Sequence, residues 1–273
     1  MFRNLSVCAA VLVLTGCEGI QTTSGVEYLE GYMIAPAAYS DGSPRIDPDI
    51  AEAASFEPTL RFPARIGLAR VVRGTLTGIP GEEQGLWAEL AEKHAGLGSF
   101  VAVSPLIAAL GSATPTSRQH RYCRGSWSGS ADWGICQTVL SRELVKTIRL
   151  ASARQHLDAV LIYELGAYGS KENTILALFD VTLIGGAILP TRSLEARGEA
   201  SAILVDVRSG YPYATASADV ELSELSISYG SDKARDDLIS EAMLKTVEEL
   251  LPKIDGIAAD LLKSQTLGTG DPT

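Results

Sequence analysis

Residues 193–207, SLEARGEASAILVDV, alternate between small or apolar side chains and polar or charged ones. This period of two is typical of a β-strand with one apolar and one polar face. Residues 208–210, Arg-Ser-Gly, follow as a tight turn, and residues 211–225 return as a partner strand. We therefore predict an antiparallel hairpin in the second half of the chain. Its first strand carries Leu194, Ala196, Gly198 and Ala200 on the apolar face and Glu195, Arg197 and Glu199 on the charged face.

The segments on either side of this hairpin predict further strands and two helices. A helix that begins at Ser141 leads into a strand over Asp158–Leu165, because helical spacing of the apolar residues changes there to a continuous apolar run. Residues Asn173–Ile184 are apolar on both faces and are expected to form a central strand. A last helix begins at Asp232, and Pro252 is expected to kink or break it, since the proline ring displaces the carbonyl four residues earlier.

The first half of the domain alternates strands with a helix. Strands are expected over Ala64–Arg73 and Ser99–Ser104, and a helix over Pro80–Lys93. That helix has two glutamates in its first turn, Lys93 in its last, and Gly96 as a C-cap. The full order is strand, helix, strand, helix, a four-strand meander and a long helix. We therefore predict an α+β (mixed α/β) fold, with a mixed, largely antiparallel sheet and helices packed against it.

The N-terminal residues have the pattern of a bacterial lipoprotein signal. Arg3 gives a short positive region, Val7–Leu14 is an apolar stretch, and residues 14–17, LTGC, resemble a lipobox. A membrane-spanning helix would need roughly 20 apolar residues, and Glu18 ends this run. We therefore expect a signal peptide over residues 1–16 and acylation of Cys17. Glu18 in place of an aspartate favours the outer membrane, with the protein on its periplasmic face.

Composition divides the mature chain into three parts. Residues 17–60 are rich in Gly, Ser, Pro and Asp and carry turn signals such as Pro36 and Asp47-Pro48. We expect a flexible tether there, or in its second half a loop laid over the domain surface. Residues 61–263 are expected to form a single periplasmic α/β domain, and the polar residues 264–273 a disordered tail.

The charge of the mature chain excludes several classes of partner. The full sequence has 23 basic and 33 acidic residues, and the signal peptide removes only Arg3, which leaves 22 against 33 and a net charge of −11. An acidic chain repels nucleic acid and anionic lipid surfaces. We therefore expect no nucleic-acid partner, and contact with the membrane through the lipid anchor.

The cysteines predict one disulfide. Cys8 leaves with the signal peptide and Cys17 takes the lipid, which leaves Cys123 and Cys136. In an oxidising periplasm this pair is expected to close a short loop, a cross-link that adds about 3 kcal/mol of stability. A metal site or a redox pair is the alternative, but CxxC spacing is absent and no histidine lies within the loop.

The same loop contains two tryptophans, Trp127 and Trp133. Either they pack back onto the domain as a small satellite core, or they form an interaction patch together with Arg121 and Arg124. Trp and Arg are the residues that dominate binding hot spots. The four residues are therefore candidates for contact with a partner.

Two short segments carry a resemblance to a known family. Residues 153–163, ARQHLDAVLIY, resemble the helix-to-strand step of periplasmic modules of the CsgG, LpoB and TolB N-terminal type, and residues 202–214 resemble their hairpin. The resemblance covers residues 60–260 and implies an α/β module of the cell envelope. CsgG proteins form a secretion pore with extra amphipathic strands. Here the insertion at 107–140 lacks two alternating strands, so we do not expect a pore.

No catalytic, metal or cofactor site is predicted. His94, His120 and His156 fall on separate elements, and neither HExxH nor another short metal spacing occurs. His94 and His156 are expected at helix C-termini, where a cation is favourable. Residues 125–129, GSWSG, lack the central serine of a nucleophile elbow.

Two carboxylates remain as candidates for acid–base chemistry, Asp180 and Asp206, on neighbouring apolar strands. A carboxylate that meets backbone or arginine partners is the more common case at such positions, although catalysis stays open. The sequence therefore favours a non-catalytic adaptor or assembly factor that binds an envelope protein. The alternatives are an envelope hydrolase whose groups meet only in the fold, and a small-ligand carrier with a large apolar pocket.

Overall fold

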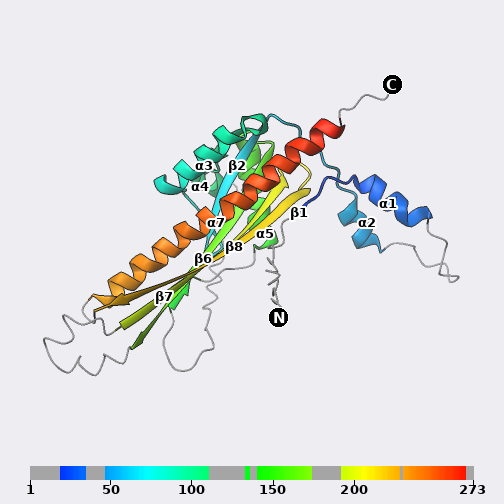
Figure 1. Cartoon of the computed structure of the whole chain (residues 1–273). Coiled ribbons are helices and arrows are strands. Elements are labelled where there is room, and N and C mark those ends of the chain that lie inside the picture. Colours follow the sequence, from blue (N-terminus) through cyan, green and yellow to red (C-terminus); the bar gives the residue numbers. More distant parts are fainter. Residues whose placement is uncertain are drawn as a thin grey trace, which may run out of the picture.

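The structure, a computed structural model, describes residues 19–34, 47–110, 133–135, 140–173, 192–227 and 230–268 (Figure 1). These residues form one eight-stranded sheet. In chain order the strands are β1 Gly19–Ile20, β2 Ala64–Val72, β3 Thr75–Thr77, β4 Gly98–Ala102, β5 Trp133–Ile135, β6 Ala159–Asn173, β7 Arg192–Asp206 and β8 Pro212–Ser226. The helices are α1 Gly25–Ile34, α2 Pro48–Ala54, α3 Gly81–Lys93, the 3-10 turn η1 Ala95–Leu97, α4 Pro105–Ala109, α5 Arg142–Arg154 and α7 Ser231–Gly268.

The sheet has the order β1-β8-β7-β6-β2-β3, with β4 paired to β2 and β5 paired to β6. Strand β2 is parallel to β4 and β6, and the other pairs are antiparallel. The predicted α+β class and the mixed, largely antiparallel sheet are therefore confirmed. The predicted hairpin is also confirmed, since β7 and β8 pair from Arg192↔Ser226 to Val205↔Pro212.

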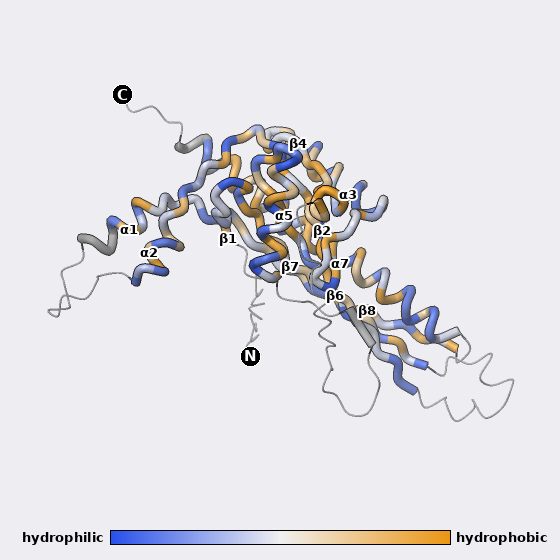
Figure 2. The backbone as a smooth tube through the Cα atoms, turned by 180° about the vertical axis from the view of Figure 1, so that it is seen from behind, coloured by the Kyte–Doolittle hydropathy of each residue, from blue (hydrophilic) through white to orange (hydrophobic). Residues whose placement is uncertain are grey.

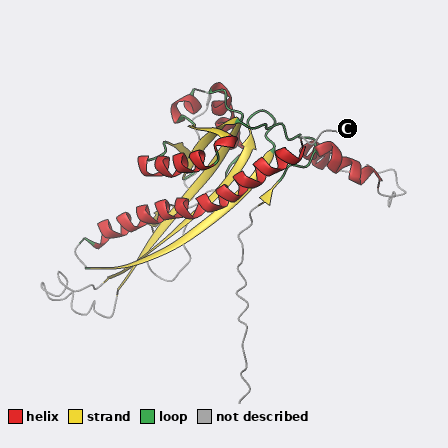
Figure 3. Cartoon of the chain, turned by 45° about the horizontal axis from the view of Figure 1, so that its top comes forward, coloured by secondary structure: helices red, strands yellow, loops and turns green. Residues whose placement is uncertain are grey.

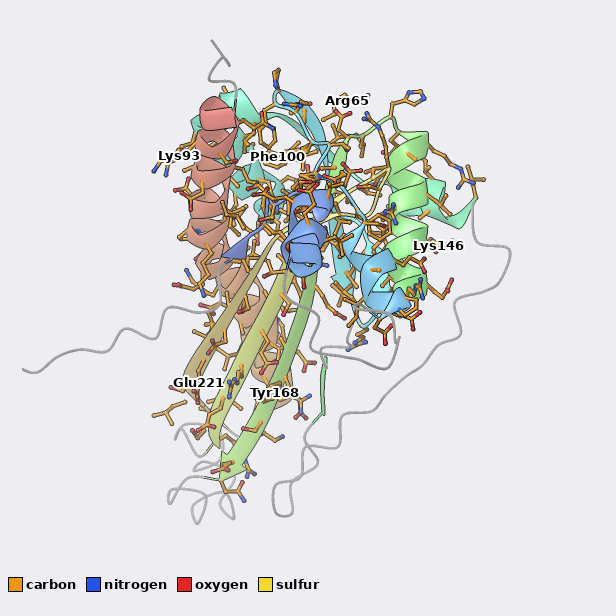
Figure 4. All side chains as sticks on the ribbon, turned by 90° about the vertical axis from the view of Figure 1, so that its right-hand side faces the viewer. Arg65, Lys93, Phe100, Lys146, Tyr168 and Glu221 are labelled. Carbon is orange, nitrogen blue, oxygen red and sulfur yellow. The ribbon has the colours of Figure 1, made fainter. Side chains whose placement is uncertain are left out.

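Helices cover both faces of the sheet around its parallel centre, and Figure 4 shows α7 on one side and α5 on the other. One core layer joins the sheet to α3 and α7 through residues such as Trp87 and Leu250. The other joins it to α4 and α5 through residues such as Ala108 and Ile148. Burial on both faces explains the continuous apolar run at the start of β6, where Ala159–Tyr163 are all buried.

Strand β6 differs from its prediction, because it continues to Asn173 instead of ending at Leu165. It pairs directly with β7 from Ala159↔Asp206 to Asn173↔Arg192. No strand therefore lies between β6 and β7 in the described part. Asn173 itself belongs to β6, and the rest of the central strand predicted over Asn173–Ile184 lies outside the described residues.

The predicted break at Pro252 is wrong, since α7 runs through this residue as one helix. An internal proline costs about 3 kcal/mol because it removes a main-chain hydrogen bond. Val247, Leu250 and Ile254 on both sides of Pro252 are buried in the core. Their packing outweighs the local cost and holds one continuous helix. None of the helices in the described ranges is long and apolar enough to cross a bilayer.

The N-terminal segment has more structure than the expected tether. Gly19 and Ile20 pair with Thr215 and Ala214 of β8, and the Gln21 N–H donates to the Tyr213 carbonyl at 2.7 Å. Helices α1 and α2 follow, and Figure 1 shows them beside the end of the sheet. The turn-rich composition gave no sign of this, because main-chain pairing with a strand edge needs no particular side chains.

Candidate functional site

The long strands divide the molecule into two regions, which Figure 3 shows along the length of α7. We call "the arm" residues 166–173 of β6, 192–199 of β7, 219–226 of β8 and 231–246 of α7. We call "the body" the rest of the sheet apart from β5, which pairs with β6 in the arm, together with α3, α4, α5 and the remainder of α7. Figure 2 shows hydrophilic colours gathered at the far ends of the arm strands. The arm is therefore an extension of the sheet past the two-sided core.

Helix α7 covers one face of the arm. Leu194 and Ala196 of β7 pack there against Leu238 and Ala242, and all four are buried. The approach is close at Gly198, where a Cβ atom would lie 2.1 Å from Thr246 Oγ1 and 2.7 Å from the Ala242 carbonyl oxygen. A glycine at this position is what allows the helix and the strands to meet.

The opposite face of the arm carries mostly polar side chains and has no helix against it among the described residues. Cross-strand pairing aligns Tyr168, Arg197 and Glu221 in one row, and Figure 4 labels Tyr168 and Glu221 on its two outer strands. We call this surface the open face. It consists of Tyr168, Ser170, Glu172, Glu195, Arg197, Glu199, Asp219, Glu221, Ser223 and Leu225.

The open face is acidic, since its five carboxylates surround one cation, Arg197. Arg197 Nε lies 3.5 Å from Glu199 Oε1. The neighbouring Tyr168 hydroxyl raises the pKa of the Arg197 guanidinium, and Glu199 and Asp219 act in the same direction. Tyr168 is 41% exposed on this face. The alternation in the sequence predicted a charged face on β7, but it did not show that Asp219 and Glu221 of β8 extend this face.

The structure places part of the predicted interaction loop next to this surface. The backbone of Trp133 opens β5, and β5 pairs with β6 through Trp133↔Gly169 and Gly134↔Tyr168. The Trp133 side chain lies outside the described part of the structure. So do Trp127, Arg121, Arg124, the predicted disulfide partners Cys123 and Cys136, and the anchor residue Cys17. The predicted disulfide, anchor and patch remain predictions.

Asp206, one of the two candidate carboxylates, is a structural residue at the β7–β8 turn. Its Oδ1 accepts hydrogen bonds from the main-chain N–H groups of Arg208 at 2.7 Å and Ser209 at 2.8 Å. Its Oδ2 accepts from the Thr59 hydroxyl at 2.8 Å and the Tyr213 hydroxyl at 3.2 Å. Burial raises the pKa of Asp206, but these hydrogen bonds, led by that of Ser209, lower it to a net value below the ordinary one. Asp180 lies outside the described residues.

A second buried charge, Glu83 of α3, was not predicted. Arg70 Nε lies 2.9 Å from Glu83 Oε1, and the Tyr163 hydroxyl donates to Glu83 Oε2 at 3.0 Å. Burial, together with the Glu83 carboxylate, raises the pKa of Tyr163. The centres of the Trp87 and Tyr163 rings lie 5.2 Å apart. The buried Nε1 of Trp87 has no hydrogen-bond partner among the described residues. With both charges paired in the core, this group holds α3 on the sheet.

The histidines within the described part do not meet. His94 follows the last residue of α3, and its Nε2 lies 2.7 Å from Asp255 Oδ1, beside Lys93. Hydrogen bonds from Lys93 and His94 lower the pKa of Asp255. His156 follows α5 with a φ of 55°. Among the described residues, no three His, Cys, Asp or Glu side chains gather closely enough to hold a metal ion. His120 lies outside these residues.

Two hollows lie side by side beneath the 58–62 segment and share Phe62 and Leu261. The apolar one, between the sheet and α7, has a volume of about 20 Å³. That is roughly the space of one water molecule. The other is an open cleft of about 220 Å³ lined in part by Arg61, Tyr213 and Gln265. Gln265 joins its two sides, since it accepts from the Phe62 N–H and donates to the Leu60 carbonyl.

Comparisons with known proteins add little to this geometry. No family model and no curated protein matches the chain. Among solved structures, the chain is similar to the hypothetical protein CT253 from Chlamydia trachomatis, at 12% identity and a TM-score of 0.27, with 72% of this chain and 99% of that chain covered. At this TM-score the similarity establishes neither a fold family nor a function.

Proposed function

We propose that this protein is a lipid-anchored, non-catalytic adaptor that binds an envelope protein through the open face of the arm, on the periplasmic side of the outer membrane. The observation that carries the proposal is that, among the described residues, helices cover only one face of the arm. In the body, helices pack on both faces of the sheet. In the arm, α7 packs on one face only. A partner on the open face would complete the layered arrangement that the body already has.

The chemistry of the open face supports contact with a protein. Tyr168 and Arg197 lie side by side on neighbouring strands, and aromatic residues and arginine are enriched where proteins bind each other. The surrounding carboxylates set the electrostatic character that a partner must match. The face belongs to paired strands held by α7, so a partner meets a surface of fixed shape.

The position of the proposed anchor supports an adaptor that works close to the bilayer. Only Glu18 separates Cys17 from Gly19, the first residue of β1. Consecutive Cα atoms are 3.8 Å apart, so the chain between the anchor residue and β1 is at most about 8 Å long. Acylation of Cys17 would hold the sheet beside the membrane, instead of at the end of a tether formed by residues 17–60.

The alternatives have less support from the described residues. Asp206, Glu83 and Asp255 are each engaged in contacts that hold elements together, and the buried Glu164 also interacts within the protein. An envelope hydrolase would need some of these groups for its chemistry. A carrier of apolar ligands needs a pocket of several hundred Å³, and the apolar hollow measures about 20 Å³.

Site-specific photo-crosslinking in cells tests the proposal. A photoreactive side chain replaces Tyr168 or Glu221 on the open face of the full chain, or Glu143 or Lys146 on the exposed side of α5 as matched controls. We expect discrete adducts with an envelope protein when the photoreactive side chain is at position 168 or 221. We expect no adducts when it is at either α5 position. Adding Cys17→Ser should reduce the adducts, because the chain is no longer held at the membrane. No adduct from either arm position would overturn the proposal.

A further inference from the structure

Within the described ranges, the outer edge of β8 is open along the arm. Residues 213, 215 and 217 direct main-chain groups to this side. The Tyr213 carbonyl accepts from Gln21, Thr215 pairs with Gly19, and the Ser217 carbonyl accepts from Lys253 Nζ. Because main-chain direction repeats every second residue along a strand, the odd-numbered residues Asp219–Leu225 also face outward. In the described part of the chain, no main-chain group pairs with them on that side.

Strand β1 shows that this edge accepts an added antiparallel strand. Its register, Gly19↔Thr215, continues by one residue per position and would set residue 17 opposite Ser217. A chain cleaved before Cys17 therefore has no N-terminal residue left to pair with Asp219–Leu225. As far as the described residues go, that length of edge stays available to another chain in the line of β1.

The side chains along the edge determine which chain fits. In a hydrogen-bonded antiparallel pair, directly opposite residues point to the same face, so residues opposite Asp219 and Glu221 would project over the open face. That face already holds Glu195 and Glu199. A second copy of the same edge would bring carboxylates opposite or beside carboxylates, which is unfavourable, whereas lysine or arginine at every second position would be attracted.

We propose that the β8 edge Asp219–Leu225 binds an extended segment of a partner protein that carries Lys or Arg at every second position, added as a strand beyond β1. The inference rests on the proposed adaptor function and names the chemistry of its partner. The incoming backbone pairs with β8, and its basic side chains lie over Asp219 and Glu221. Charges on an exposed edge also serve to prevent association between sheets, a role that predicts no binding.

Peptide binding to the mature lipoprotein in detergent micelles tests the inference. The probe is a short fluorescent peptide with a Lys-Val repeat, compared with a peptide of the same composition in which the lysines are consecutive. A third peptide is N-methylated at its lysines, since their N–H groups would face β8. We expect anisotropy to rise with the alternating peptide, and affinity to be at least about tenfold weaker for the other two. Equal binding of all three would show charge attraction without strand addition and overturn the proposal.

Variants of the protein test the edge itself. Ser223→Pro removes an outward N–H and leaves the pairing with β7 and all charges in place. Asp219→Lys with Glu221→Lys reverses the charge, and Glu89→Lys with Glu92→Lys on the exposed side of α3 is the matched control. We expect roughly tenfold weaker binding for the first two and unchanged binding for the control. Absence of binding by the wild type would mean that the charges only protect the edge, and the proposal would be wrong.

The two proposals fail in different ways. If Ser223→Pro abolishes peptide binding but leaves the cellular crosslinks of Tyr168 and Glu221 unchanged, the adaptor function stands and its partner binds the open face without adding a strand. If the crosslinks are absent while the peptide binds the edge, the adaptor function itself is wrong.

Discussion

The body and the arm share three strands but are built on different principles. In the body, Val160–Tyr163 of β6 are buried on both faces. In the arm, the same strand alternates, with Ala167 and Gly169 beneath α7 and Tyr168 exposed. A strand buried on both faces needs apolar residues throughout, whereas one buried on a single face needs them only at alternate positions. The remaining positions of the arm are therefore available for function without cost to folding.

The largest expected effect belongs to the body. Glu83→Ala leaves the Arg70 guanidinium buried without its partner, and removal of one member of a buried ion pair costs about 3–5 kcal/mol. The matched control is Glu89→Ala on the exposed side of the same helix, which should change stability by less than about 0.5 kcal/mol. Urea denaturation measures both. Equal losses for the two variants would mean that the buried pair does not hold α3 on the sheet.

A second variant tests how firmly α7 holds the covered face of the arm. Gly198→Val places a side chain where Thr246 Oγ1 and the Ala242 carbonyl already lie, so α7 must move away. We expect a loss of about 3 kcal/mol, the upper end for overpacking. Gly85→Ala on α3 is the control of opposite sign, because nothing lies within 4 Å and alanine favours a helix by about 1 kcal/mol. Little loss from Gly198→Val would show that α7 is loosely attached to the arm.

A third variant concerns the turn that joins β7 and β8 at the body end. The pKa of Asp206 is lowered in the folded protein, so its stabilisation is present above the ordinary aspartate pKa and is lost as the pH falls through the lowered value. Asp206→Asn should cost about 1–2 kcal/mol at neutral pH. It should also weaken the decline of stability with acid. Melting curves across the acid range check both effects. An acid decline identical to that of the wild type would show that Asp206 does not contribute to it.

The sequence predicted the elements whose burial pattern is local. Helix α3, helix α5 and the β7–β8 hairpin follow periodicities that a reader can see in the residues. Three features depend on distant contacts and could not be predicted. The continuation of β6 to Asn173 rests on pairing with β7, and α7 passes Pro252 because the core holds both sides. The order in residues 19–21 rests on main-chain pairing with β8, and α1 packs against α2.

In the candidate site, too, local patterns were predictable and features that depend on distant contacts were not. The charged face of β7 is visible in the alternation of residues 193–199, but its extension over β8 requires the register Arg197↔Glu221. The sequence directed attention to tryptophan and arginine in the 123–136 loop, and the structure describes only β5 from that region. Glu83 gave no signal at all, because an acidic residue in the first turn of a helix is fully explained by the helix dipole.

The smallest expected effect on stability belongs to the open face. Glu221→Lys changes an exposed side chain, so the free energy of unfolding should stay within about 0.5 kcal/mol of the wild-type value. The same substitution reverses a charge that the proposed basic partner contacts, so it should reduce the crosslinks formed from Tyr168. Denaturation and crosslinking of the same variant therefore give opposite results if the arm is a binding surface. A loss of stability as large as that of Gly198→Val would show instead that another segment of the chain packs on this face. In that case the arm is covered on both sides, and the contrast with the body disappears.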